Sequence, residues 1–299
     1  MIVLDAHQIF SSMYDVFVEP FVQFGFMRRA LVACVALGLG AGAVGLFLVL
    51  RRMTLIGDAM SHAIMPGAAL GFLLYGGVSL FAMGLGGLVA GSLVVIGSSL
   101  VNRKTKLAED ASFGAFHIAS LALGVLLISL GGSNIDLMQI LFGSILSIDN
   151  QTILLVAGIA TFSMISLAFL FRSLVMDSFD TKFLSVVSGR GAVTQNLFML
   201  LVVINLVSGF EAVGTLMSVG IIIIPSITSI LWSNRISTMI MISTLNITAS
   251  TYIGLVLSYH LNIPSSSAII LVLTLFYVIS LMLTTKKNKQ LTLELNNEN

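Results

Sequence analysis

The sequence GDAMSHAIMPG, residues 57–67, is the starting point for interpreting this chain. It leads into residues 59–102, which contain no Asp, Glu, Lys or Arg. Residues four apart share one face of a helix, so Asp58 and His62 are predicted to point toward the same place. Ionisable side chains within a membrane span are costly and face a partner, a cavity or a pathway. A carboxylate beside an imidazole suits a divalent metal such as zinc or manganese.

The composition indicates a membrane protein. The 299 residues are 57% hydrophobic and 9% charged, whereas soluble domains carry about 25% charged residues. The mean hydropathy is +1.07, so we predict an all-α polytopic membrane protein. A net charge of +1 with dispersed cations argues against a nucleic-acid partner. The single cysteine, Cys34, cannot form an intrachain disulfide and is expected to be a small core residue.

A transmembrane helix needs about 20 predominantly apolar residues. Nine segments are candidates: 30–50, 53–76, 78–101, 111–130, 151–171, 192–208, 212–232, 236–260 and 263–285. The second is the weakest as a straight helix, because Pro66 removes a backbone donor and kinks or breaks a helix. Broken helices at membrane depth line cavities and mark transport sites. We therefore expect eight to nine transmembrane helices with a broken second span.

The distribution of cations predicts the orientation of these spans. When the connections are assigned alternately to two sides, twelve of the fourteen lysines and arginines fall on one side. The other side holds only Arg28 and Arg29. This asymmetry predicts an inner-membrane protein with its C-terminus in the cytoplasm and its N-terminus outside. The acidic residues collect on the outer side, where Glu211 is expected at the start of the seventh span and is a candidate for the secondary pathway.

We expect three regions along the chain. Residues 1–27 form an amphipathic, extracytoplasmic segment, residues 28–285 the transmembrane domain, and residues 286–299 a polar cytoplasmic tail. Within the second region, residues 178–190 are predicted to form a short amphipathic helix on the cytoplasmic surface. Its apolar face includes Phe179, Phe183 and Leu184 at helical spacing, and Gly189 suits its end. From this pattern alone, anchoring of a loop at the interface is favoured over docking of a soluble partner.

Other motifs are absent or ambiguous. The chain contains no G-x-x-x-x-G-K-[ST] sequence, so uphill transport would take its energy from an ion gradient or another subunit. His117 lies in the fourth span, seven residues after Asp110. It is a candidate for an exit-side pathway residue, although a packing role with satisfied hydrogen bonds is the interpretation that its position favours.

Several segments together resemble the membrane permease subunit of the zinc, manganese and iron ABC importer family. The resemblance covers about residues 26–283 and includes residues 50–67, within which residues 57–67 are its most specific part. The other matching segments, in the order in which they occur in the family, are Phe26 to Leu31, Glu109-Asp110 with Gly114, Ile140 to Gly143, Phe179-Asp180 ahead of Gly189, and Gly214 to Leu216 leading to Pro225.

The resemblance implies that this chain is a transport subunit rather than an enzyme. Two permease copies would form the pathway, two cytoplasmic ATPases would drive it, and a periplasmic or lipid-anchored protein would deliver the metal. No permanently bound cofactor is implied, only a transported divalent metal. Asp58 and His62 match the residues that contact this metal, and Phe179, Asp180, Phe183, Leu184 and Gly189 match the coupling helix that docks on the ATPase.

A different class of transporter remains open at this stage. A secondary carrier or channel could use the same carboxylate and imidazole to couple metal movement to protons. Dependence of transport on a separate ATPase would distinguish the two.

Overall fold

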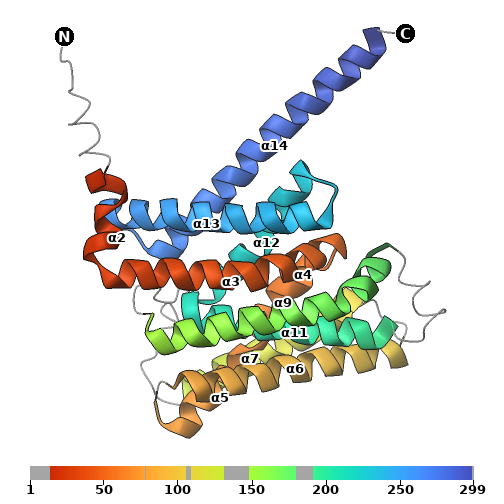
Figure 1. Ribbon diagram of the computed structural model, residues 1–299. Helices are drawn as coiled ribbons and strands as arrows, with labels where there is room; N and C mark the ends of the chain where they lie inside the picture. Colours follow the sequence, from red (N-terminus) through yellow and green to blue (C-terminus); the bar gives the residue numbers. More distant parts are fainter. Residues whose placement is uncertain (1–13, 78, 106–108, 131–147, 180–190, 298–299) are drawn as a thin grey trace.

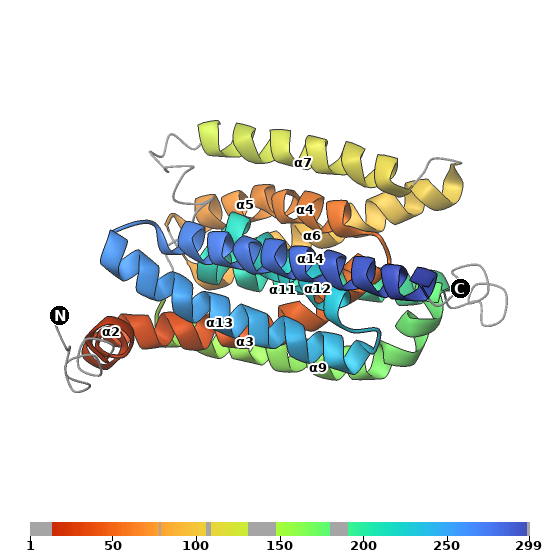
Figure 2. The ribbon, with the colours of Figure 1, turned by 90° about the horizontal axis from the view of Figure 1, so that it is seen from above.

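The computed structural model describes residues 14–77, 79–105, 109–130, 148–179 and 191–297. Within these ranges all regular structure is helical, and eight helices are long and apolar enough to cross a membrane. Figures 1 and 2 show them as one bundle, with the far end of the last helix projecting beyond the others. The predicted all-α membrane fold is therefore confirmed.

The helices of these ranges are α2 (Glu19–Gln23), α3 (Gly25–Leu50), α4 (Thr54–Ala63), α5 (Met65–Tyr75), α6 (Leu80–Lys104), α7 (Glu109–Leu130), α9 (Asn150–Phe179), α11 (Gly191–Val213), α12 (Thr215–Trp232), α13 (Ile236–Leu261) and α14 (Ser265–Asn297). The short helices α4 and α5 together occupy the predicted second span. The other eight predicted spans each correspond to one long helix.

Helix α3 is the most buried of the eight candidate spans among the described residues. Its most apolar window is 72% buried, whereas the corresponding window of α7, at the outer edge in Figure 2, is 17% buried. Glycines let neighbouring helices approach α3 closely. A Cβ atom at Gly45 would lie 1.9 Å from the carbonyl oxygen of Ile222 in α12, and one at Gly40 would lie 2.9 Å from Cα of Ala160 in α9. Cys34 is fully buried in the same helix, as predicted.

The second span is interrupted at a single residue. Helix α4 ends at Ala63 and α5 begins at Met65, with Pro66 in its first turn. Pro66 has no N–H to continue the hydrogen-bond ladder, which explains the position of the break. Ile64 keeps right-handed helical dihedral angles (φ −76°, ψ −22°), so the chain stays coiled through the interruption. The Ser120 hydroxyl of α7 donates to the Ala63 carbonyl oxygen at 2.9 Å, supplying a bond at the end of α4.

Helices α5 and α6 cross with their backbones in contact. A Cβ atom at Gly67 would lie 1.9 Å from the carbonyl oxygen of Gly86, and one at Gly86 would lie 2.0 Å from that of Gly67. Only residues without a side chain fit at this crossing, because both obstructing atoms belong to the backbone. The contact holds α5 against α6 directly after the break.

A buried ion pair joins α3 to α9. The Arg51 guanidinium pairs with the Asp177 carboxylate, and both side chains are almost completely buried. The guanidinium carbon also lies 5.2 Å from the ring centre of Phe198 in α11, in cation–π geometry. The next residue, Arg52, has a left-handed φ of 58°, which turns the chain from α3 into α4. The pair therefore connects the end of α9 to the turn that leads to Asp58.

Several element boundaries differ from the expected ones. Helix α3 begins at Gly25 rather than residue 30, because extended dihedral angles at Phe24 separate it from α2. This places Arg28 and Arg29 inside the first turns of a long helix. Helix α9 continues to Phe179, which takes in the first two residues of the expected coupling helix. At the other terminus α14 runs on through the expected polar tail to Asn297, in a segment rich in helix-forming Lys, Gln, Leu and Glu.

Candidate functional site

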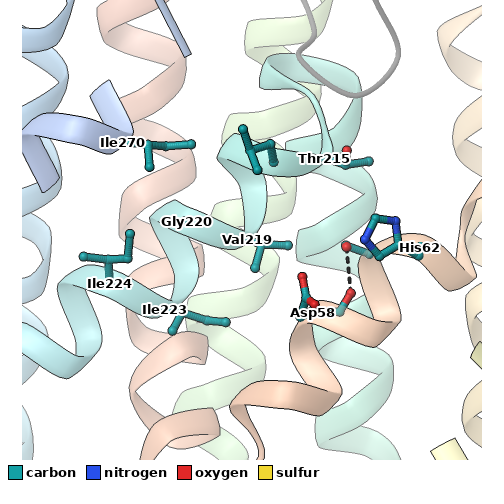
Figure 3. Close-up of a pocket in the computed structure, with 10 residues that line it drawn as sticks. Asp58, His62, Thr215, Val219, Gly220, Ile223, Ile224 and Ile270 are labelled. Atoms are coloured by element: carbon teal, nitrogen blue, oxygen red, sulfur yellow. Dashed lines mark hydrogen bonds between the residues drawn. The ribbon is translucent and has the colours of Figure 1, made fainter. Parts of the chain in front are cut away.

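Asp58 and His62 lie on the same side of α4, as their spacing predicts. Figure 3 shows both at a pocket that α4 shares with α12 and α14. The cavity has a volume of about 360 Å³ and is lined by Asp58, Ser61, His62, Thr215, Leu216, Val219, Gly220, Ile223, Ile224 and Ile270. The polar groups at the pocket come mainly from α4, while α12 and α14 contribute a mostly apolar wall.

The carboxylate and the imidazole differ in their exposure. Asp58 is exposed on the surface of the single chain, whereas His62 is half-buried and its Nδ1 atom has no solvent contact. Ser61, between them in sequence, donates from its hydroxyl to the Asp58 backbone carbonyl at 2.7 Å. The hydroxyl proton of Ser61 is therefore occupied within α4, and the Asp58 side chain remains directed toward the pocket (Figure 3).

His117 lies directly beside His62. The two ring centres are 5.6 Å apart and the ring planes are inclined by 35°. Both Nδ1 of His62 and Nε2 of His117 are buried, and neither has a hydrogen-bond partner among the residues that the structure describes. The hydrogen bond expected of a packing residue is thus not seen at Nε2 of His117 among the described residues, and the role of His117 stays a prediction. The sequence held no signal for this contact, because it depends on how α7 packs against the end of α4, where Ser120 meets the Ala63 carbonyl oxygen.

Glu211 occupies a different helix from the expected one. The predicted sixth span ended at residue 208, but α11 continues to Val213 and the turn is made at Gly214, whose φ of 87° suits glycine. Glu211 thus lies near the end of α11 rather than at the start of the next span. Its carboxylate packs on Gly84 of α6, and Oε1 is buried without a hydrogen-bond partner in the described part of the chain. Glu211 does not line the pocket that contains Asp58.

Most of the predicted coupling segment lies outside the described residues. This applies to Asp180, Phe183, Leu184 and Gly189, whose expected helix therefore stays a prediction. Phe179 is the last residue of α9, two positions after the ion-paired Asp177.

Asp58 and His62 do not by themselves form a closed metal site. Within the part of the chain that the structure describes, no three or more His, Cys, Asp or Glu side chains are grouped so as to hold a metal ion. A carboxylate oxygen and an imidazole nitrogen are suitable ligands for a first-row divalent metal. Asp58 and His62 thus form an incomplete coordination shell at an open pocket. Such a shell suits a transported ion better than a permanently bound one.

Comparison with known proteins gives consistent matches over nearly the whole chain. The ABC 3 transport family matches residues 23–284. The manganese import system permease protein ScaB of Streptococcus parasanguinis is 34% identical over 273 residues, which are 91% of this chain and 96% of that protein. The manganese transport system membrane protein MntC of Listeria innocua is 32% identical over 271 residues, with 91% and 95% covered.

A solved structure shares the fold. The chain superimposes on one from PsaBC of Streptococcus pneumoniae in complex with Fab, with a TM-score of 0.77 and 31% sequence identity. The match covers 88% of this chain and 94% of that one. The fold described here therefore has a counterpart in a structure that was solved by experiment.

Proposed function

Because this chain belongs to the ABC 3 transport family and is a permease subunit of a metal-ion ABC importer, we propose that it carries manganese(II) past Asp58 and His62. The ATPase activity of such importers resides in a separate subunit, so the permease itself is not an enzyme. The observation that carries the proposal is the placement of one carboxylate and one imidazole at an open pocket next to a helix break.

The relatives support manganese as the cargo. Both ScaB and MntC are manganese transport proteins by name, and they match this chain over more than nine-tenths of its length. An oxygen ligand from Asp58 suits manganese, which prefers harder donors than zinc does. Zinc and iron(II) are the competing cargoes, and a transport assay that offers all three metals separates them.

The exposure of Asp58 supports a pathway built from two copies of the permease. A carboxylate that is exposed on the surface of a helix bundle within the membrane needs a partner or a water-filled cavity. A second copy placed against this face would enclose the pocket and bring a second Asp58 and His62 to it. Four protein ligands would then surround the ion, with water available for the rest of the shell.

The proposed coupling and orientation follow the same family scheme. The segment that contains Phe179, Asp180, Phe183, Leu184 and Gly189 would dock on the cytoplasmic ATPase, and a binding protein would deliver the metal from outside. Glu211 is proposed as a secondary pathway residue near the outer ends of α11 and α6. The cytoplasmic location of the C-terminus rests on the asymmetric distribution of lysine and arginine.

The test is transport by the reconstituted permease, ATPase and loaded binding protein in liposomes. We expect ATP-dependent uptake of manganese, reduced at least tenfold by Asp58→Asn and by His62→Ala. Asp15→Asn is the matched control, because Asp15 is an exposed carboxylate before α2, far along the chain from the pocket.

Two results would contradict the proposal. If both pocket variants took up manganese at the wild-type rate, Asp58 and His62 would not lie on the transport pathway. Metal uptake by the permease alone, driven by a proton gradient without ATP, would make the chain a secondary carrier.

A further inference from the structure

Two histidines from separate helices meet beside the pocket with unpaired nitrogens. The rings of His62 in α4 and His117 in α7 lie 5.6 Å apart between centres. Nδ1 of His62 and Nε2 of His117 are both buried, and no residue of the described ranges forms a hydrogen bond with either atom. Leaving a buried polar atom unpaired costs about 1–3 kcal/mol, and buried polar groups in proteins are nearly always paired. A purely structural role for the two rings leaves this cost unexplained.

The surrounding contacts hold the two rings in place. Ser120, three residues after His117, donates to the Ala63 carbonyl oxygen directly after His62. Further along α7, a Cβ atom at Gly124 would lie 3.2 Å from the backbone nitrogen of Pro66, so α7 follows the chain across the break. The packing of α7 against both α4 and α5 therefore determines that the two imidazole rings lie side by side.

We propose that His62 and His117 form a two-nitrogen binding station for a divalent transition metal, next to the pocket that contains Asp58. Imidazole nitrogens are common ligands of such ions. His117 does not line the pocket, so the station lies behind His62 as seen from α12. It rests on the proposed function, because it adds a residue and a second position to the proposed pathway.

The chemistry of the station differs from that of the pocket. The pocket offers the carboxylate of Asp58 with one imidazole, whereas the station offers two nitrogen donors and no carboxylate. With two protein ligands it is incomplete, so water molecules supply the remaining positions. Nitrogen donors favour the later metals of the first transition series, so zinc should bind at the station more tightly than manganese.

The test measures metal binding without transport. The permease is purified together with its ATPase, placed in nanodiscs without binding protein, and titrated with zinc alone against a zinc-binding dye. His117→Phe keeps a ring of similar size but removes both nitrogens, so a packing role survives while a ligand role does not. His260→Phe is the matched control, because His260 lies on α13 and its Nε2 is 3.0 Å from the Val16 carbonyl oxygen.

We expect zinc affinity to fall at least tenfold in His117→Phe and to stay unchanged in His260→Phe. X-ray absorption of zinc on the wild-type protein should show two imidazole ligands. Unchanged zinc affinity in a monodisperse His117→Phe complex would overturn the inference, and so would a spectrum with a single imidazole. These results are separate from the proposed function, which fails if the complete importer does not take up manganese even though zinc binds as expected.

Discussion

At the scale of single residues, Gly67 and Gly86 determine how closely α5 and α6 approach after the helix break. We predict that Gly67→Ala destabilises the permease by about 3 kcal/mol or more, because the new Cβ atom would overlap the Gly86 carbonyl oxygen at 1.9 Å. Thermal unfolding of the purified protein in detergent measures this effect.

Gly158→Ala is the matched control for that prediction. Gly158 lies within α9, and a Cβ atom there would meet no atom of the described residues within 4 Å. Alanine is favoured over glycine inside a helix by about 1 kcal/mol, so this variant should melt at the wild-type temperature or slightly above it. Equal melting temperatures for Gly67→Ala and Gly158→Ala would show that the α5–α6 crossing is looser than described.

At the scale of helices, the start of α9 is capped by Asp149. Its Oδ1 atom accepts hydrogen bonds from the Thr152 N–H at 2.8 Å and from the Thr152 hydroxyl at 2.6 Å. These hydrogen bonds lower the pKa of Asp149 below its usual value. Removing the cap by Asp149→Ala should cost about 1 kcal/mol, measured as a lower melting temperature at neutral pH.

The same cap predicts a dependence on pH. Because the pKa of Asp149 is lower in the folded protein than in the unfolded chain, the charged form favours folding. This stabilisation is present above the unfolded pKa of about 3.9 and is lost as pH falls through the lower folded pKa. Asp149→Asn keeps a capping side chain but does not titrate. The wild type should therefore lose stability relative to Asp149→Asn in melts below pH 4, and parallel curves would contradict the prediction.

The Arg51–Asp177 pair gives a second prediction at this scale, for the junction of α3 and α9. Removing one member of a buried ion pair leaves an uncompensated charge and costs about 3–5 kcal/mol. Arg51→Met alone should therefore be strongly destabilising, since Asp177 is buried. The double variant Arg51→Met with Asp177→Leu should recover much of the loss, and a double-mutant cycle of melting temperatures tests this. Purely additive effects would mean that the two charges do not interact.

At the scale of the whole molecule, the ends of the bundle differ in charge. In Figure 1 the end of α3, the end of α6 and the start of α13 lie at the same side, which carries Arg51, Lys104 and Arg235. We predict that this side and the C-terminus face the cytoplasm. Fluorescent protein fused to the C-terminus should be bright, and alkaline phosphatase fused there should be inactive. The reverse pattern would invert the orientation.

The sequence predicted those features that depend on neighbours along the chain. The break follows from Pro66, and the shared face of Asp58 and His62 follows from a spacing of four residues. The position of His117 beside His62 depends on the packing of α7 on α4, which spacing within one helix does not reveal. Glu211 was assigned to the wrong helix because the turn depends on a positive φ at Gly214, which the hydropathy of the sequence does not reveal.

The complete burial of Cys34 has a practical consequence. It is the single cysteine of the chain, and with no exposed surface it is out of reach of thiol reagents while the protein stays folded. The natural protein therefore serves as its own unlabelled background, and no cysteine-free parent has to be made. In the proposed two-copy assembly, a spin label on Leu55→Cys would report the spacing of the copies as a single distance, because that side chain is 81% exposed on the helix that carries Asp58. A change of this distance on ATP binding would show that the proposed ATPase partner moves the two copies relative to each other.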